Sequence, residues 1–333
     1  MTTYFVVLYL SPSWEKIYIH SCTLGTIGKG LIILGAITSV IIWFIYILKQ
    51  SVLVSIANEI YRVNNDLKRC KHYKLKTNYF PYFIFIGNFI LCFFIMLVGI
   101  VTHQYVSVPF WSTPCILISW VIIQYTITLI VINQNIACLN EMLLKLGNVD
   151  TKIKFQKLFV TKFPLREAII LDIMNINHAN KKLCKICNDV ANFFTIPILS
   201  AIIYFAMTTI YELRYLFLSI TNKSYGTIPP FLIHLDSVSW FMIVLFDLTA
   251  FTSSVTSTSR EFKKTALYIH LLLDRCTMDL ITEKTLIEFS RDLLHRNVEF
   301  TAFHITVLDG SLLHSFFGTI VTYLIILTQF RVR

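Results

Sequence analysis

Polar and ionisable side chains that interrupt long apolar stretches are the residues of this sequence best placed for specific chemistry. Asp247 is the sharpest case, because it lies too deep inside the apolar stretch 234–256 for a short side chain to reach water easily. Seven further polar or aromatic residues lie in or near such stretches: His103, Trp120, Gln124, Tyr211, Glu212, Asp236 and Trp240. A pocket for a small organic ligand needs aromatic walls and a few fixed polar groups, so all eight are candidate ligand-binding residues.

Each candidate also has a structural explanation. Trp120 and Trp240 are compatible with anchors at the membrane interface, where tryptophan is common. His103, Glu212 and Asp236 lie near the ends of the apolar stretches and are compatible with simple solvation. For Asp247, a functional role and a partnered structural acid both stay open.

The sequence has no arrangement typical of an enzyme or a metal site. Cys184 and Cys187 have CxxC spacing, but no second pair accompanies them, so zinc or redox use is disfavoured. No nucleophile–base pair and no cluster of metal ligands stands out. We therefore expect no catalytic activity, no metal and no cofactor.

The elements that position these residues follow from the composition. Of the 333 residues, 56% are hydrophobic and 14% are charged, whereas roughly 25% are charged in a soluble domain. This composition excludes a cytosolic enzyme and a secreted disulfide scaffold. Six apolar stretches reach the roughly 20 residues that a membrane-spanning helix needs: 26–48, 80–101, 113–133, 190–212, 234–256 and 308–330. The sequence therefore predicts an all-α, polytopic helical membrane protein.

Basic residues set the predicted orientation in the membrane. Of the 29 Lys and Arg residues, 23 lie in three long connections, 49–79, 134–189 and 257–307. The positive-inside rule places these connections in the cytoplasm and the C-terminus outside. Because the basic residues form short blocks between apolar runs, the net charge of +10 does not indicate nucleic-acid binding. Asn222, in an Asn-Lys-Ser sequon, falls in a connection assigned to the outside and is a glycosylation candidate.

The chain divides into four predicted regions. Residues 1–25 hold an apolar stretch too short to cross a membrane, which we expect to be the outer end of a truncated first helix or an interfacial segment. Residues 26–256 form a ligand-binding helical bundle with cytoplasmic loops, in which apolar residues at helical spacing predict that some helices continue into the cytoplasm. Residues 257–307 form a cytoplasmic helical anchor, and residues 308–330 form the final helix.

The final helix carries a recognisable motif. It consists of Thr322-Tyr323, five mostly hydrophobic residues, and Gln329-Phe330. Upstream, the pattern continues with Phe300, Thr301, Ala302, Leu308, Asp309, Leu312 and Leu313. This ending resembles the signature of the insect gustatory receptor family; Thr328 departs from it as a polar residue at a usually hydrophobic place.

The resemblance implies a seven-helix chemoreceptor with an extracellular C-terminus. Receptors of that family are ligand-gated cation channels, usually tetramers, in which four copies of the final helix line a central pore and cytoplasmic helices join the subunits. The expected partners are a small-molecule tastant, permeating cations, related subunits in a homo- or heterotetramer, and the lipid bilayer. The expected location is the cell membrane, in the dendrite and soma of a chemosensory neuron.

Several residues of the final helix are compatible with such a pore: Thr322, Tyr323, Ile326, Gln329 and Phe330. Thr322 and Gln329 are seven residues apart and share one helix face, as do Tyr323 and Phe330. Polar side chains border a water path well, and a bulky ring such as Phe330 can close it by dewetting. The alternative is that Thr322 and Gln329 only bond to neighbouring helices.

We therefore expect a taste receptor that acts as a ligand-gated cation channel. The alternatives are a metabotropic seven-helix receptor, which would keep its C-terminus in the cytoplasm, and an odorant-receptor-like channel with the same architecture. A transporter is disfavoured because the sequence shows no repeat halves with paired broken helices.

Overall fold

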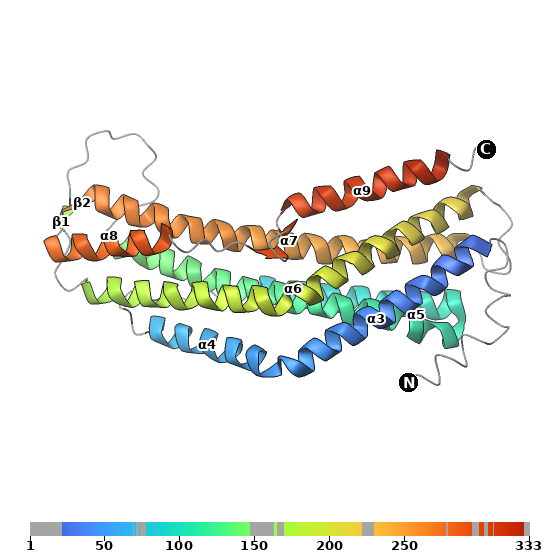
Figure 1. Cartoon of the computed structure of the whole chain (residues 1–333), viewed down its shortest axis with the longest axis horizontal. Helices are drawn as coiled ribbons and strands as arrows, with labels where there is room; N and C mark the ends of the chain where they lie inside the picture. Colours follow the sequence, from blue (N-terminus) through green and yellow to red (C-terminus); the bar gives the residue numbers. More distant parts are fainter. Residues whose placement is uncertain are drawn as a thin grey trace.

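The described part of the chain is almost entirely helical. The computed structural model describes residues 22–68, 70, 73, 78–146, 163–164, 170–221, 230–277, 279–294, 300–302, 306–308 and 310–329. Within them lie seven helices: α3 (Cys22–Leu48), α4 (Gln50–Lys68), α5 (Phe80–Leu146), α6 (Ile170–Thr221), α7 (Pro230–Arg275), α8 (Leu280–Leu294) and α9 (Gly310–Gln329). They form an elongated bundle, with α4 and α8 toward one end and the end of α9 at the other (Figure 1). The all-α prediction is confirmed.

The helix α5 folds back on itself. The amide nitrogen of Asn88 donates a hydrogen bond to the Ser119 hydroxyl, and the rings of Phe85 and Trp120 lie 5.2 Å apart. A straight helix would separate residues so far apart in sequence by about 45 Å. The chain therefore reverses within α5, which has a first limb, Phe80–Val101, and a second limb, Ser112–Leu146.

Five stretches of the described residues are long and apolar enough to cross a membrane: Ile27–Leu48, Phe80–Val101, Ser112–Leu146, Ile170–Phe217 and His234–Asp274. They overlap five of the six predicted spans. The sixth coincides with α9, whose apolar part, Gly310–Ile326, is shorter. The protein is thus a multi-pass membrane protein, as predicted.

Helices α5, α6 and α7 also continue beyond the predicted spans. The extension of α5 packs tightly, because Ile136, Leu139 and Leu143 are all fully buried at helical spacing. The long side chains of α6 link this end to its neighbours: Lys182 Nζ lies 2.9 Å from an Asp66 carboxylate oxygen on α4. Lys181 Nζ lies 2.5 Å from Asp292 on α8.

Within the predicted anchor region 257–307, the described residues include the end of α7 and all of α8, and two short strands follow. The helical part of this region ends with α8, and a small antiparallel ladder pairs β3 (Thr301–Ala302) with β4 (Thr306–Val307). A second, parallel ladder pairs β1 (Phe163–Pro164) with β2 (Cys276–Thr277).

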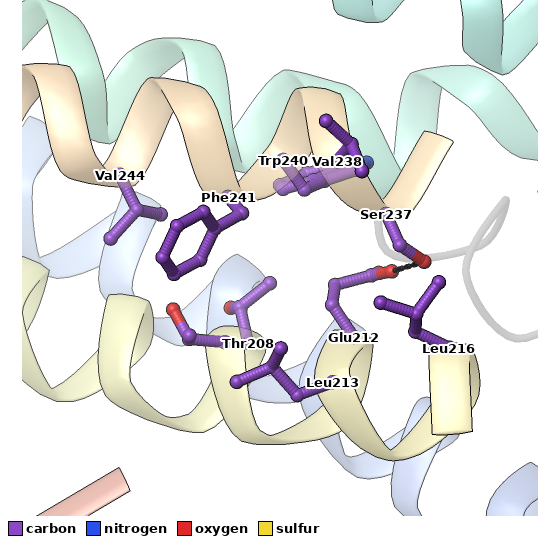
Figure 2. Close-up of a pocket in the computed structure, with 10 residues that line it drawn as sticks. Thr208, Glu212, Leu213, Leu216, Ser237, Val238, Trp240, Phe241 and Val244 are labelled. Atoms are coloured by element: carbon purple, nitrogen blue, oxygen red, sulfur yellow. Dashed lines mark hydrogen bonds between the residues drawn. The ribbon is translucent and has the colours of Figure 1, made fainter. Parts of the chain in front are cut away.

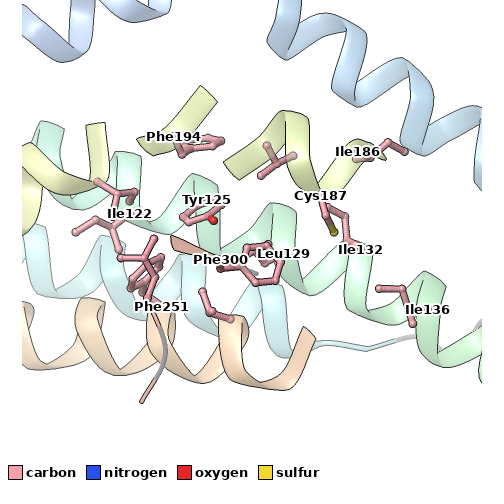
Figure 3. Packing of buried hydrophobic residues seen from close by; sticks show 14 of the residues in the cluster. Ile122, Tyr125, Leu129, Ile132, Ile136, Ile186, Cys187, Phe194, Phe251 and Phe300 are labelled. Carbon is pink, nitrogen blue, oxygen red and sulfur yellow. The ribbon is translucent and has the colours of Figure 1, made fainter. Parts of the chain in front are cut away.

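The core lies where α5, α6 and α7 meet (Figure 3). The Tyr125 ring stacks on Phe194 at 4.8 Å and lies 5.5 Å from Phe251, so one side chain from each helix meets there. Large apolar side chains also point outward, among them Trp43 at 69% exposure and Phe83 at 68%. Such exposure suits contact with acyl chains, and the interior is then held by close packing rather than by exclusion of water.

Candidate functional site

A cavity of about 110 Å³ lies between α6 and α7 (Figure 2). Its lining residues lie near the end of α6 and the start of α7, at the end of the bundle where α9 also ends (Figure 1). Ten described residues line it: Thr208, Thr209, Glu212, Leu213, Leu216, Ser237, Val238, Trp240, Phe241 and Val244. On each helix they recur every three or four residues, which places them on one face. Two long helices therefore build this cavity from facing stripes.

The main polar group of the cavity is a buried carboxylate. Glu212 is only 4% exposed, and its Oε2 accepts a hydrogen bond from the Ser237 hydroxyl at 2.9 Å. Figure 2 shows the two side chains pointing toward one another across the gap between the helices. Asp236, also buried, lies close enough to repel the charge of Glu212. Two buried acidic side chains thus lie at one end of a mostly apolar space.

The threonine hydroxyls of the cavity already donate their hydrogen bonds to the backbone of α6. The Thr208 hydroxyl donates to the Tyr204 carbonyl oxygen at 2.7 Å, and the Thr209 hydroxyl donates to the Phe205 carbonyl oxygen at 2.7 Å. Both hydroxyls are therefore satisfied within α6. Glu212 and Ser237 remain as the side chains best placed to bond a ligand.

One wall of the cavity contacts the final helix. The ring of Phe241, on α7, lies 6.1 Å from the ring of Phe317 on α9. Phe317 in turn packs edge-on against Phe316 at 5.5 Å. Leu312, Phe316 and Ile320 form the buried stripe of α9. A change in the position of Phe241 would therefore act directly on the packed side of α9.

Of the predicted pore residues, Thr322 and Gln329 lie on α9 away from its buried stripe, whereas Tyr323, seven residues after Phe316, is in line with that stripe. Thr322 and Gln329 are exposed, and so are Tyr323 at 44% and Ile326 at 42%. The Thr322 hydroxyl donates to the Gly318 carbonyl oxygen at 2.8 Å. Phe330, the predicted constriction, lies outside the described residues.

Asp247 occupies a second buried polar cluster, separate from the residues that line the cavity. It is fully buried, and its Oδ1 accepts a hydrogen bond from Asn88 Nδ2 at 3.0 Å. The same amide bonds to Ser119, and the Cys92 thiol donates to Asn88 Oδ1 at 3.6 Å. This cluster ties both limbs of α5 to α7. It gives Asp247 hydrogen-bonded partners within the buried part of the bundle.

The remaining ligand candidates are distributed over other contacts. Trp120 packs against Phe85 on the first limb of α5. Gln124 accepts a hydrogen bond from the Tyr46 hydroxyl on α3 at 2.6 Å. Tyr211 is buried in a small cluster with Leu31 on α3. His103 and Asn222 fall where the structure describes no side chains.

Of the eight ligand candidates, the structure thus brings Glu212 and Trp240 together at the cavity, with Asp236 beside them. The sequence analysis missed Phe241, although it follows Trp240 directly and lies four residues after Ser237. Its type gave no signal in the sequence, because its role comes from its neighbour Phe317 on α9. Among the described residues, no group of three or more His, Cys, Asp or Glu side chains is placed to hold a metal ion.

Comparison with known proteins identifies the family. The model of the family described as 7tm Chemosensory receptor matches residues 1–332. The chain belongs to this family. The predicted relation to insect chemoreceptors is confirmed, and the family is one of receptors rather than enzymes.

Two relatives from Drosophila melanogaster are gustatory receptors by name. "Putative gustatory receptor 28a" is 29% identical over 163 residues, which is 48% of this chain and 35% of the relative. "Putative gustatory receptor 28b" is 29% identical over 181 residues, which is 51% of this chain and 36% of the relative. The matched part of the receptor thus spans about a third of the length of each relative.

Two solved structures share the fold. The insect olfactory receptor OR5 from Machilis hrabei matches with a TM-score of 0.66 at 11% identity, covering 94% of this chain and 83% of that one. The same receptor in complex with eugenol matches with a TM-score of 0.57 at 12% identity, covering 95% and 92%. At these identities the similarity establishes the helical fold alone.

Proposed function

We propose that this receptor is a subunit of a ligand-gated cation channel that detects a small-molecule tastant. The observation that carries the proposal is the contact between Phe241, in the wall of the cavity, and Phe317, on α9. The names of the two Drosophila relatives support a role in taste. The eugenol complex of OR5 shows that a receptor of this fold takes a small organic ligand.

In the proposed mechanism, the tastant binds the cavity more tightly in the open state than in the closed state. This difference in affinity shifts the equilibrium between the two states. The ligand displaces Phe241, Phe317 follows, and α9 moves as a rigid helix. Thr322 and Gln329 then border the water path, while Phe330 leaves the pore axis.

The pore itself requires several copies of α9. We propose a homo- or heterotetramer in the cell membrane of a chemosensory neuron, with the exposed side of α9 facing the central axis. This arrangement would explain why Thr322 and Gln329, which gain nothing from contact with lipid, lie on the exposed part of an otherwise apolar helix. The extensions of α5, α6 and α7, with α4 and α8, would join the subunits on the cytoplasmic side.

Current recording tests the proposal. The receptor is expressed in cells, small molecules are screened, and the evoked current is measured with G-protein signalling blocked. A ligand-evoked cation current should persist under the block, and Phe330→Ala should raise the current in the absence of ligand. Phe83→Ala, at an exposed position on α5, is the matched control. Loss of the evoked current under the block, at wild-type surface expression, would contradict a channel.

A further inference from the structure

The described lining of the cavity includes an acidic side chain and no basic one. Glu212 lies in its lining and Asp236 lies nearby, and both are at least nine-tenths buried. None of the ten described residues that line the cavity is Lys, Arg or His. A buried carboxylate is costly unless a positive charge or several donors compensate it, and the hydrogen bond from the Ser237 hydroxyl supplies only part of that compensation.

The rest of the lining suits an organic cation. Trp240 and Phe241 provide aromatic rings, whose faces attract positive charge. Leu213 and Val244 provide apolar surface for an uncharged part of the same ligand. The polar end and the apolar walls of the cavity are therefore complementary to a single molecule that has a positively charged group and a small hydrophobic part.

The volume limits the size of that hydrophobic part. An apolar protein cavity of about 150 Å³ is large enough for benzene, and the cavity here measures about 110 Å³. A ligand with a single small ring fills this space only if a wall gives way. Phe241 is a wall residue whose ring packs near Phe317 on α9, so entry of such a ligand would push on the final helix.

We propose that the cavity between α6 and α7 binds a small protonated amine with one ring or a short apolar chain. Its ammonium group donates hydrogen bonds to Glu212, and its apolar part lies between Phe241 and Val244. This inference rests on the proposed function in one respect: it takes the cavity as the ligand site of the receptor.

Direct binding to the purified full-length chain in lipid nanodiscs tests the inference without relying on current. The probes are benzylamine, which is charged at neutral pH, and benzyl alcohol, which is uncharged and of nearly the same shape. Saturation-transfer NMR, with one probe competing against the other, gives their relative affinities. Because hydrogen bonds to charged groups are stronger than neutral ones, benzylamine should bind about tenfold more tightly or better.

Three variants assign that preference to Glu212. Glu212→Gln keeps an acceptor for Ser237 but removes the charge, so the preference for benzylamine should disappear. Glu212→Asp keeps the charge and should keep the preference. Asp247→Asn, a neutralised buried acid on α7 that does not line the cavity, is the matched control and should also keep it.

The outcomes separate this inference from the channel proposal. Equal affinity for the two probes, or a preference that survives Glu212→Gln, overturns the amine assignment, whereas the cavity could still serve another tastant. Absence of binding by benzylamine overturns it as well. A preference for benzylamine that depends on Glu212 supports the amine site even if no current is recorded. That pair of results would count against the channel proposal and not against the amine site.

Discussion

At the scale of single residues, Asp247 is the side chain whose surroundings predict the clearest effect on stability. Its Oδ1 accepts the Asn88 amide, and apolar helices enclose the pair. Asp247→Leu removes this acceptor and should lower the free energy of unfolding by about 1 kcal/mol, the usual range for a hydrogen bond between membrane helices. Asp247→Asn keeps an acceptor and should cost less. Thermal unfolding in detergent measures both.

The control for Asp247 is a carboxylate in a different setting. Glu141 forms an exposed ion pair with Lys145 at 3.0 Å, so Glu141→Leu should change the unfolding temperature little. Equal unfolding temperatures for Asp247→Leu and Asp247→Asn would show that the contact with Asn88 does not stabilise the bundle.

Asp279 predicts a pH dependence outside the membrane-spanning segments. It precedes α8, and its side chain accepts a hydrogen bond from the Thr282 hydroxyl, which lowers the pKa of Asp279. The pKa of Asp279 in the folded protein lies below the unfolded value of about 3.9. The stabilisation of α8 by this carboxylate is therefore fully present above the unfolded pKa and is lost as the pH falls through the folded pKa. Amide hydrogen exchange, corrected for intrinsic rates, should show α8 fraying in acid.

The matched variant for this effect is Asp279→Asn. Asparagine caps a helix about as well as aspartate but does not titrate in acid. At neutral pH, α8 should be protected from exchange in this variant no better than in the wild type. Its protection should no longer fall when the pH is lowered. An unchanged acid response in Asp279→Asn would assign the fraying to another group.

At the scale of elements, helix positions were readable from the sequence because a spanning helix requires an apolar run of fixed length. Five predicted spans overlap stretches long enough to cross, and the sixth coincides with α9. The extent of each helix was less readable: outside the apolar runs only the spacing of Ile136, Leu139 and Leu143 indicated that α5 continues. Short ladders such as β3 with β4 gave no signal, since two residues are too few for a period.

The candidate site was readable only in part. Unusual polarity drew attention to Glu212, Asp236 and Asp247, but polarity does not say which helices face one another. The structure separates Asp247, which bonds to α5, from Glu212, which faces α7. Phe241 could not stand out among 27 phenylalanines, because its importance comes from its neighbour on α9 rather than from its type.

The contact between α7 and α9 carries a prediction at this scale. If Phe241 transmits ligand binding to Phe317, Phe241→Ala and Phe317→Ala should each raise the ligand concentration that gives half-maximal current. The double variant should lose less than the sum of the two, by about 0.5–1.5 kcal/mol, the usual interaction energy of an aromatic pair. Concentration–response curves for the four receptors give this coupling energy.

A second cycle controls for indirect effects. It combines Phe241→Ala with Phe89→Ala, because Phe89 is 57% exposed and lies on α5. Distant positions normally contribute independently, so this pair should be additive. If the effects of Phe241→Ala and Phe317→Ala were also additive, this pair of rings would not transmit ligand binding to the pore.

At the scale of the whole molecule, the two ends of the bundle differ in chemistry. One end holds α4 and α8 and the ion pairs of Lys181 and Lys182. The other end holds the cavity and the end of α9. Basic residues concentrate in the three connections that include the first end, which is the pattern of a cytoplasmic side. The cavity would then open toward the outside, where a tastant arrives.

This orientation predicts the sidedness of the C-terminus, and sidedness separates a channel of this architecture from a metabotropic receptor. An epitope tag after Arg333 should be labelled by antibody on intact cells, since α9 runs away from the basic end of the bundle. A tag inserted in the basic connection 147–162 should be labelled only after permeabilisation, and it serves as the control for membrane integrity. If the C-terminal tag also required permeabilisation, α9 would run in the opposite direction, and both the external cavity and the proposed route to the pore would have to be abandoned.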